Sequence, residues 1–384
     1  MRKIILQFRQ KAFNHEGMKC GKNRNLQFGD KRVVNIGIVG LGKMGVMHAA
    51  MASQCPNAKV GALIDLDRGL ASHVQSIGVN APTFETIAQA HAATPIDAVA
   101  IAAPSFAHRA LAEEALRLGI HVLTEKPLAH SLADAMAMAE AAKAHPKLVS
   151  AVAFMKGHIG LFFDSAKLLH SGALGEVRRF SASVYLSQVF SPKSGWTFTK
   201  DRSGGGVLIN TGIHLIHLCS LLFGRVTAVY CKARPMHSSV EDTLTAIMEF
   251  ENGSFGSVDM SWSVPGYETE STHFVVEGSN GVMELDDLRR RLHLLSPWQD
   301  VPKGASAAHQ SQFDHAAFSL TPDYAGEGYY KEMRDFVEAI QQKKSPRYTF
   351  EDGLQIQRIV DALYRSSEGN QRIVLDPPAG LAVQ

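Results

Sequence analysis

The sequence predicts an α/β protein, with a doubly wound parallel sheet in an N-terminal domain and a large, mainly antiparallel open sheet in a C-terminal α+β domain. Two observations lead to this fold class. From Val33 onward, short apolar strands alternate with apolar-periodic helices, as in βαβ units. After residue 155, strands follow one another through turns such as Asn252–Gly253, as in antiparallel sheets. We therefore expect domains at 33–154 and 155–384.

In the first domain, strands are expected at 34–39, 59–64, 97–102, 120–124 and 148–153. Helices are expected between them, at 44–54, 67–77, 84–91, 107–118 and 131–144. When a helix connects two neighbouring strands, it carries the chain back to the end of the sheet where the first strand began. The second strand then runs parallel to the first. This domain is therefore expected to have a parallel sheet with helices on both faces.

The second domain is expected to begin with a helix at 161–171, a strand at 177–188 and a helix in the region 204–218. The strands that follow are expected at 226–234, 242–250, 254–263, 272–277, 281–285 and 292–295. The segment 299–325 is polar and is expected to be irregular. Two helices, 327–342 and 351–367, close the fold, and 351–367 is a candidate to pack back on the first domain.

Composition gives little indication of a macromolecular partner. With a formal net charge of +2 over 384 residues, the chain is not expected to bind nucleic acid or a membrane surface. Four scattered cysteines without CxxC spacing indicate reduced thiols and a cytoplasmic protein. Residues 1–32 are basic and lack the apolar core of a signal peptide. We expect a disordered extension or a start codon placed too early, with a functional basic arm as the alternative.

The stretch VNIGIVGLGKMG places Gly40, Gly42 and Gly45 directly after a strand and at the start of a helix. In this context GxGxxG predicts a dinucleotide site: the glycines permit a tight turn, close approach of a pyrophosphate and close helix packing. Asp65 ends the next strand, where its carboxylate is suited to the ribose 2′-hydroxyl of NAD. Arg68 nearby leaves NADP open as the alternative. Lys43 and Met44 lie within the same turn.

A second pattern lies further along, in AAPSFAH and then TEKP. Pro104 and Ser105 end a strand at the carboxyl edge of the sheet, where open α/β sheets bind ligands. Lys126 follows another strand end, where it is suited to hydrogen-bond a reacting hydroxyl and help move its proton. Pro127 restricts the backbone, and a cis Lys126–Pro127 bond is compatible with the sequence. Taken alone, Lys126 also fits an exposed lysine without a catalytic role.

The stretch GGGVLINTGIHLIHL places Asn210, His214 and His217 at i, i+4 and i+7, on one face of a helix. A histidine can accept a proton near neutral pH, so His214 and His217 are candidate acid/base groups. A histidine on an apolar helix also fits a core residue. Metal ligation by His214 and His217 is a further alternative, but no carboxylate or cysteine has matching spacing, and no metal is expected.

In this order and spacing, GLGKMG, AAPSFAHRALAEEALRLG, HVLTEKPLA and GGGVLINTGIHLIHL resemble the Gfo/Idh/MocA family of oxidoreductases. The resemblance runs from about Val33 to Leu375 and includes SGALGEV, VEDTLTAIMEFENGSFGSV and YYKEMRDFVEAI. It implies an N-terminal Rossmann domain and a C-terminal α/β domain with a large open sheet. It also implies oxidation or reduction of a carbinol of a sugar, sugar derivative or cyclitol with NAD or NADP.

The resemblance also implies site residues. Lys126 and His214 match the family's lysine and acid/base histidine and are the expected catalytic residues. Asn210 and His217 occupy positions that usually hold aspartate. The asparagine amide would hold a substrate hydroxyl, whereas His217 fits packing or hydrogen bonding behind the site. The expected substrate-binding residues are Asn210, Lys156, His217 and Trp196. The expected cofactor-binding residues are Gly40, Gly42, Lys43, Met44, Gly45, Asp65, Arg68, Pro104, Ser105, His108, Glu125 and Lys126.

The departures at Asn210 and His217 keep two alternatives open: an oxidoreductase that retains its nucleotide between two substrates, and a dinucleotide-binding regulator without turnover. The presence of both Lys126 and His214 favours the enzyme, because a chain without catalysis has no chemical need for both. A broad antiparallel sheet with one uncovered face needs an apolar partner. We therefore expect a homodimer or homotetramer.

Overall fold

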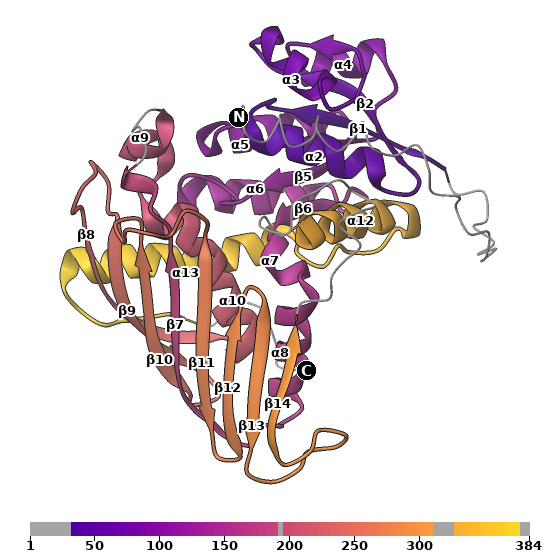
Figure 1. The fold of residues 1–384 in the computed structure, drawn as a ribbon. Coiled ribbons are helices and arrows are strands. Elements are labelled where there is room, and N and C mark those ends of the chain that lie inside the picture. Colours follow the sequence, from indigo (N-terminus) through magenta and orange to yellow (C-terminus); the bar gives the residue numbers. More distant parts are fainter. Residues whose placement is uncertain (1–31, 191–194, 310–325, 377–384) are drawn as a thin grey trace. The chain divides into compact units, whose positions relative to one another are not determined.

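The structure is a computed structural model that describes residues 32–190, 195–309 and 326–376. The expected extension, apart from its last residue, and the segment 310–325 therefore lie outside the described residues. The chain forms two compact units, whose elements are labelled in Figure 1. Of the described residues, the first unit comprises 32–125, 137–153 and 326–350, and the second comprises 126–136, 154–190, 195–309 and 351–376.

The first unit is built on a six-stranded parallel sheet with the order β3-β2-β1-β4-β5-β6. The chain winds outward from β1 in both directions, which is the topology of a Rossmann fold. The prediction for this domain is confirmed, although a strand of only two residues, β3, was missed. The strands are β1 (Val34–Val39), β2 (Ala58–Ile64), β3 (Thr83–Phe84), β4 (Ala98–Ile101), β5 (His121–Glu125) and β6 (Ser150–Ala153).

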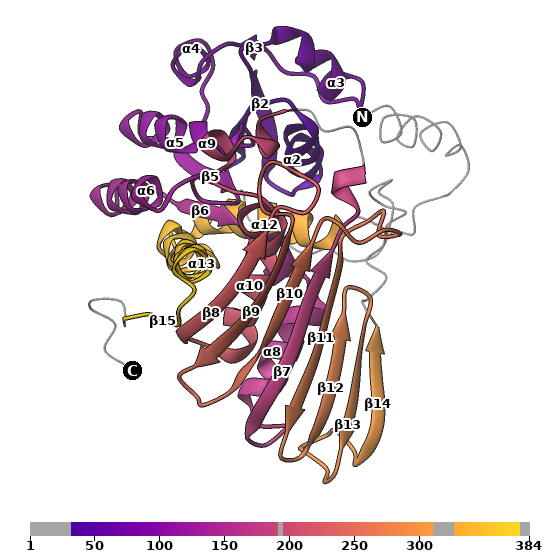
Figure 2. The same ribbon diagram turned by 90° about the vertical axis from the view of Figure 1, so that its left-hand side faces the viewer.

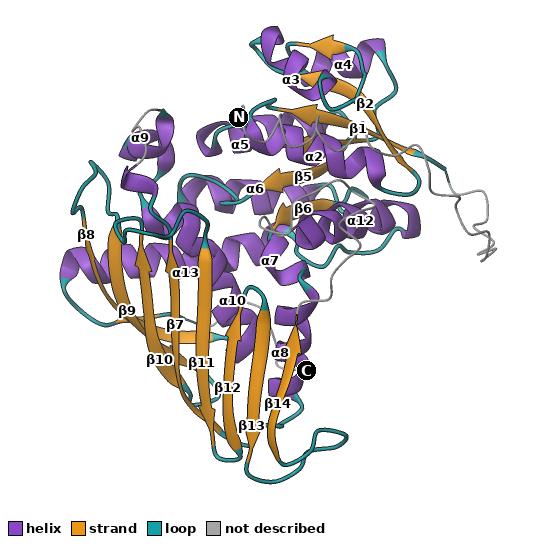
Figure 3. Cartoon of the chain, in the orientation of Figure 1, coloured by secondary structure: helices purple, strands orange, loops and turns teal. Residues whose placement is uncertain are grey.

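Helices follow these strands along the chain and are coloured purple in Figure 3. They begin close to the expected residues because each apolar face recurs with helical period between turn residues. Every side chain of the central strand β4 is buried, as are nearly all of those in β1, β5 and β6, as expected where helices cover both faces of a sheet; β2 and the edge strand β3 are less buried. The helical elements are α2 (Lys43–Gln54), η1 (Arg68–Leu70), α3 (Ala71–Gln75), α4 (Ile87–Ala93), η2 (Ser105–Ala107), α5 (His108–Arg117) and α6 (Leu132–Ala144).

One helix differs from the expected domain division. The helix α12 (Gly326–Gln342) lies in the first unit and packs against α2, whereas the sequence placed all of 155–384 in the second domain. Its buried side chains, Tyr329, Met333 and Phe336 among them, give it a clear apolar face. Such a face shows that a helix is covered but not by which sheet. The return of the chain to the first unit was therefore not visible in the sequence.

The second unit is built on a nine-stranded sheet with the order β14-β13-β12-β11-β7-β10-β9-β8-β15, seen in Figure 2. All neighbours pair antiparallel except β7 and β10, which are parallel. The predicted open, mainly antiparallel sheet is confirmed. The strands are β7 (Val177–Tyr185), β8 (Val226–Arg234), β9 (Thr243–Phe250), β10 (Phe255–Ser261), β11 (Ser271–Gly278), β12 (Gly281–Asp286), β13 (Arg289–Leu294), β14 (Gly304–His309) and β15 (Ile373–Val374).

Two edge strands were not predicted. The segment 299–325 was expected to be irregular, but its residues Gly304–His309 form β14, which pairs with β13. The sequence GASAAH carries no large apolar residue. As an edge strand, β14 is held by backbone hydrogen bonds to β13 and does not bury a large apolar face. At the other edge, β15 has only two residues. Both strands therefore lack the alternating apolar pattern from which strands are read.

Helices cover one face of this sheet, with α8 and α10 on the same side in Figures 1 and 2. Aromatic rings join them to the strands: Phe223 of α10 stacks on Phe180 of β7, with ring centroids 4.2 Å apart, and Phe250 of β9 meets Phe180 edge-on at 5.6 Å. Burying one such ring contributes roughly 2–3 kcal/mol. The helical elements are α7 (Met155–His158), α8 (Gly160–His170), η3 (Gln188–Phe190), η4 (Trp196–Phe198), α9 (Lys200–Ser203), η5 (Leu208–Gly212), α10 (Ile213–Phe223) and α13 (Phe350–Gly369).

One stretch, 200–223, is long and apolar enough by length and composition to cross a membrane. However, 83% of its most apolar window is buried inside the structure, as in the core helix of a globular domain. The apolar character of this stretch is therefore accounted for by the packing of α10 against α8 and β7.

Candidate functional site

The glycine turn of the first unit has the geometry that a phosphate-binding turn needs. Gly40 has φ +85°, and a Cβ there would lie 2.6 Å from the backbone nitrogen of Ala103. A Cβ at Gly45 would collide with the carbonyl oxygen of Gly40, so the helix can pack closely only with glycine there. A Cβ at Gly42 would meet nothing within 4 Å, so the space beside this backbone is open. Lys43, which is exposed, and Met44, which is half-buried, begin α2.

Asp65, which follows β2, is tied to the same turn. Its Oδ2 atom accepts a hydrogen bond of 2.7 Å from the backbone N–H of Leu41, and Oδ1 accepts one of 2.8 Å from Asp67. The carboxylate is thereby held against the glycine turn while keeping acceptor capacity on both oxygens. Arg68 forms an exposed ion pair with Glu85 at 3.3 Å. A carboxylate held at this position disfavours the 2′-phosphate of NADP, so Asp65 favours NAD.

The carboxyl end of β4 carries the expected second loop. The imidazole of His108 donates a hydrogen bond of 2.9 Å from Nε2 to the carbonyl of Ala103, which braces the loop. Pro104 precedes η2, whose first residue, Ser105, is 2% exposed. Among the described residues, the Ser105 hydroxyl has no hydrogen-bond partner. This edge of the sheet therefore holds a polar group that is available to a ligand.

A buried polar contact at the end of β5 was not predicted. His48 on α2 is 1% exposed, and its Nε2 lies 2.9 Å from Oε1 of Glu125, the residue before Lys126. The edge of the Tyr329 ring on α12 faces His48, with centroids 6.4 Å apart. A signal was present in the sequence, since His48 falls among the apolar positions of α2. The pair holds the Glu125 side chain in place, and Glu125 was expected only as a cofactor-binding residue.

Glu332 on α12 adds a second carboxyl group to this core. Its side chain is 2% exposed, and neither oxygen has a hydrogen-bond partner among the described residues. Burial, with the Glu125 and Asp335 carboxylates nearby, raises the pKa of Glu332 well above its usual value. Folding therefore favours the neutral, protonated form of this carboxyl group.

This protonated carboxyl group makes stability depend on pH. Between the pKa of Glu332 in the unfolded chain, about 4.3, and its raised value in the folded protein, the folded state binds more protons. The free energy of unfolding therefore falls as the pH rises through this window. We expect Glu332→Gln to be more stable than the wild type by roughly 1–3 kcal/mol near pH 8. Urea unfolding near pH 8 and near pH 5 checks this, because an equal difference at both pH values would contradict it.

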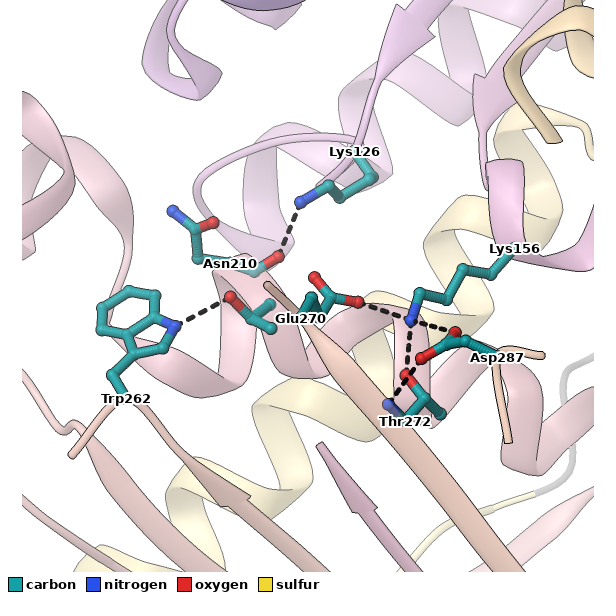
Figure 4. Close-up of polar contacts among 8 residues, drawn as sticks. Lys126, Lys156, Asn210, Trp262, Glu270, Thr272 and Asp287 are labelled. Atoms are coloured by element: carbon teal, nitrogen blue, oxygen red, sulfur yellow. Dashed lines mark hydrogen bonds and ion pairs between the residues drawn. The ribbon is translucent and has the colours of Figure 1, made fainter. Parts of the chain in front are cut away.

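In the second unit, Lys126 is fixed by a contact that the sequence did not show. Its Nζ donates a hydrogen bond of 2.8 Å to the backbone carbonyl of Asn210, as drawn in Figure 4. The Lys126–Pro127 peptide is cis, as the sequence allowed. Lys126 and Asn210 are thus brought together as expected, but through the Asn210 backbone, which leaves its side-chain amide outside this contact.

The segment that carries Asn210, His214 and His217 is not one regular α-helix. Residues Leu208–Gly212 form a turn of π-helix, η5, and only from Ile213 does the α-helix α10 follow. A π-turn is slightly wider than an α-turn, and residues four apart still lie on nearly the same side of it. The turn is anchored by Trp262, whose Nε1 donates a hydrogen bond of 2.8 Å to the hydroxyl of Thr211 (Figure 4). Trp262 was missed because it is far away in sequence.

Both histidines of α10 are buried and uncharged at neutral pH. Burial, followed by the charges of Lys126 and Lys156 and by His217, holds the pKa of His214 well below its usual value. Burial alone lowers the pKa of His217 to about 3. His217 stacks on Phe154, with centroids 4.3 Å apart and an angle of 12° between the rings. His214 is therefore a neutral imidazole close to two ammonium groups, and His217 is packed behind it.

The backbone of the triple glycine, Gly204–Gly206, lies so close to three neighbouring groups that no side chain would fit. A Cβ at Gly204 would collide with the carbonyl of His130, one at Gly205 with the hydroxyl of Tyr364, and one at Gly206 with the carbonyl of Glu241. The Glu241 carboxylate accepts hydrogen bonds from the N–H of Gly206 at 2.7 Å, from Leu208 at 3.2 Å and from the Tyr364 hydroxyl at 2.8 Å. Glu241 thus satisfies the N–H groups that begin the helical segment.

Lys156 lies in a buried cluster of charged groups. Its Nζ contacts Oε1 of Glu270 at 2.7 Å, Oδ1 of Asp287 at 3.0 Å and the hydroxyl of Thr272 (Figure 4). Burial opposes the charge, but the Asp287 and Glu270 carboxylates outweigh it and raise the pKa of Lys156. Glu270, Thr272 and Asp287 were not predicted. The other expected substrate-binding residue, Trp196, begins η4 and is half-buried.

The chain is similar to known oxidoreductases in sequence and in fold. Residues 34–153 match the oxidoreductase family's NAD-binding Rossmann fold, and residues 166–375 match its C-terminal alpha/beta domain. Levoglucosan dehydrogenase from Pseudarthrobacter phenanthrenivorans is 27% identical over 71% of this chain and 78% of its own length. The NAD⁺-dependent scyllo-inositol 2-dehydrogenase from Bacillus subtilis is 25% identical over 82% of this chain and 89% of its own.

Among solved structures, levoglucosan dehydrogenase in complex with NADH and levoglucosan superposes with a TM-score of 0.78. It is 24% identical, over 89% of this chain and 99% of that one. At this identity the likeness shows the fold. Together with the family matches over both domains, these results show that the chain belongs to the Gfo/Idh/MocA oxidoreductase family, with an NAD-binding Rossmann domain and the family's C-terminal α/β domain.

Proposed function

We propose that this protein is an NAD-dependent dehydrogenase that acts on a carbinol of a sugar, sugar derivative or cyclitol, with Lys126 and His214 as its catalytic residues. One observation carries the proposal. The second unit holds a buried His214 whose pKa is lowered by burial and then by the charge of Lys126, while the Lys126 ammonium is itself fixed on the Asn210 carbonyl. A base and a cation held close together are what removal of a carbinol proton requires.

In the proposed reaction, His214 accepts the proton of the substrate hydroxyl, because its imidazole is unprotonated at neutral pH. The Lys126 ammonium donates a hydrogen bond to the same oxygen and stabilises the negative charge that develops there. NAD, when bound, supplies the acceptor for the hydride that leaves the carbinol carbon. In the reduction direction, His214 returns the proton.

The described residues fit NAD. The open space beside Gly42 leaves room for close approach to its backbone, and the N-terminus of α2 has the partial positive charge that favours a phosphate. Asp65 would accept the adenosine ribose hydroxyls and would repel a 2′-phosphate. NADP remains the alternative, in which Arg68 would leave Glu85 to bind the extra phosphate. Lys43, Met44, Pro104, Ser105, His108 and Glu125 complete the proposed cofactor-binding residues.

For the substrate, we propose that the Asn210 amide and Trp196 contact sugar hydroxyls and the sugar ring. His217 is stacked on Phe154 and would act by holding His214 in position. Lys156 would act through the carboxylates it binds.

We also propose that the protein is cytoplasmic and forms homodimers or homotetramers. Cys55, Cys219 and Cys231 are buried free thiols, as in reducing compartments. Exposed apolar side chains share one face of the nine-stranded sheet, because their strand registers have the same parity; they are Tyr230, Ile247, Phe255 and Val282. Sedimentation of the purified protein would give the number of subunits.

The proposal is tested by following NADH and NADPH absorbance against a panel of inositols, aldoses, sugar acids and nucleotide sugars. We expect NAD reduction with at least one member, and loss of this reduction in Lys126→Ala and His214→Ala. Nucleotide that copurifies and is recycled only when two substrates are present would favour the retained-cofactor alternative. Tight NAD binding without reduction by any member would favour a regulator.

A further inference from the structure

The ammonium of Lys156 has no donor left for a substrate. It carries three N–H groups, and three acceptors surround it: Glu270 at 2.7 Å, Asp287 at 3.0 Å and the Thr272 hydroxyl. The Lys156 side chain is 4% exposed. Removing one acceptor would leave a buried charge with fewer partners, which is costly. Lys156 therefore serves as a fixed centre on which the two carboxylates are placed.

The two carboxylates differ in what else they contact. Asp287, which follows β12, also accepts a hydrogen bond of 2.7 Å at Oδ2 from the backbone N–H of Thr272, so both its oxygens are used. Glu270 precedes β11 and contacts Lys156 through Oε1 alone; within the part of the chain that the structure describes, its carboxylate has no other partner. In Figure 4, one oxygen of Glu270 points to the Lys156 ammonium and the other points away. Glu270 therefore retains a free, charged acceptor.

This free acceptor lies close to the proposed reaction centre. Lys156 lies on α7, which packs against α10, the helix that carries His214, and the charges of Lys156 and Lys126 both lower the pKa of His214. The Glu270 side chain is 24% exposed, whereas the ammonium behind it is almost completely buried. A ligand near His214 would thus meet the Glu270 carboxylate before it met Lys156.

We propose that Glu270 is a specificity-determining residue, which accepts hydrogen bonds from substrate hydroxyls away from the reacting carbinol and so selects neutral polyols over sugar acids. This inference rests on the proposed function. An ionised carboxylate only accepts hydrogen bonds, so it pairs with hydroxyl groups and repels a carboxylate placed at the same position. The contact with Lys156 fixes the geometry of the carboxylate, which lowers the entropy lost on binding.

The test uses the full-length protein with bound NADH, and pairs of sugars that differ only in one carboxylate: D-glucose with D-glucuronate, and D-galactose with D-galacturonate. Calorimetric titration gives the Kd of each sugar, and steady-state kinetics give kcat and KM for any that react. For the wild type we expect the neutral member to bind more tightly than the acid. In Glu270→Gln we expect this ratio to fall roughly ten- to a hundredfold, with KM changing more than kcat.

Glu268→Gln is the matched control, because Glu268 is exposed on the same segment. It should leave the ratio and the melting temperature unchanged. Asp287→Asn should lower the melting temperature without changing the ratio, since Asp287 acts on Lys156 and Thr272. An unchanged ratio in a folded Glu270→Gln protein would overturn the inference while leaving the dehydrogenase intact. Discrimination in binding would support Glu270 even if none of the four sugars is turned over, whereas failure of the wild type to bind any of the four would overturn the inference. The proposed function is contradicted only if no member of the wider panel reduces NAD.

Discussion

Replacing His214 with glutamine is expected to reduce kcat for carbinol oxidation roughly 100- to 10,000-fold, the usual contribution of a positioned general base. Glutamine keeps the polar, planar character of the side chain but cannot accept the hydroxyl proton. NAD affinity should remain within about twofold of the wild type, because His214 lies in the second unit, whereas the glycine turn lies in the first. Steady-state kinetics with fluorescence titration of NADH would measure both quantities. A kcat within tenfold of the wild type would contradict the role of His214.

The pH dependence of the oxidation rate should also report on His214. Because burial and the nearby Lys126 and Lys156 lower the pKa of His214, the imidazole stays unprotonated well below pH 6.5. We therefore expect the oxidation rate of the wild type to stay level as the pH falls through 6.5, and to decrease only at lower pH. The remaining activity of His214→Gln should lack this decrease.

Lys126→Met is expected to give a second large loss, roughly 100- to 1,000-fold in kcat, because it removes the cation that stabilises the developing alkoxide. Methionine fills a similar volume without charge, so the fold should be retained. The pH profile of the activity that Lys126→Met retains gives a second readout. Loss of one of the cations that lower the pKa of His214 should move the acid decrease of the rate to higher pH.

Lys43→Met, on the exposed first turn of α2, is the matched control for the lysine change. It removes a positive charge at the glycine turn and should act on the KM for NAD, leaving the pH profile in place. If Lys126→Met lowers kcat without shifting the acid decrease, the electrostatic coupling between Lys126 and His214 is wrong.

Much of the first unit could be predicted because its signals are local. A GxGxxG turn needs particular glycines within six residues, and the structure shows why: Gly40 and Gly45 have no room for a Cβ, and Gly42 faces open space. The strands of the Rossmann sheet were predicted from short apolar runs bounded by turn residues. The helix α12 was found at almost the expected residues, but its place in the first unit depends on contacts far along the chain.

The second unit was harder to predict where the geometry departs from regular spacing. A π-turn has no residue pattern that distinguishes it from an α-turn, so the sequence predicted one regular α-helix through Asn210 and His214. The partner of Lys126 lies 84 residues away and is a backbone carbonyl, which carries no side-chain signal. Glu270 and Asp287 join Lys156 only because β11 and β12 pair, which follows from the sheet register.

The most direct test of the account compares Lys126→Met and His214→Gln with the double variant that carries both changes. If the two side chains act on one hydroxyl in one proton transfer, their effects are strongly coupled. The account predicts that the double variant loses about as much kcat as the more damaging single variant. Losses that multiply, so that the double variant falls by the product of the two single effects, would show that Lys126 and His214 act independently and would contradict it.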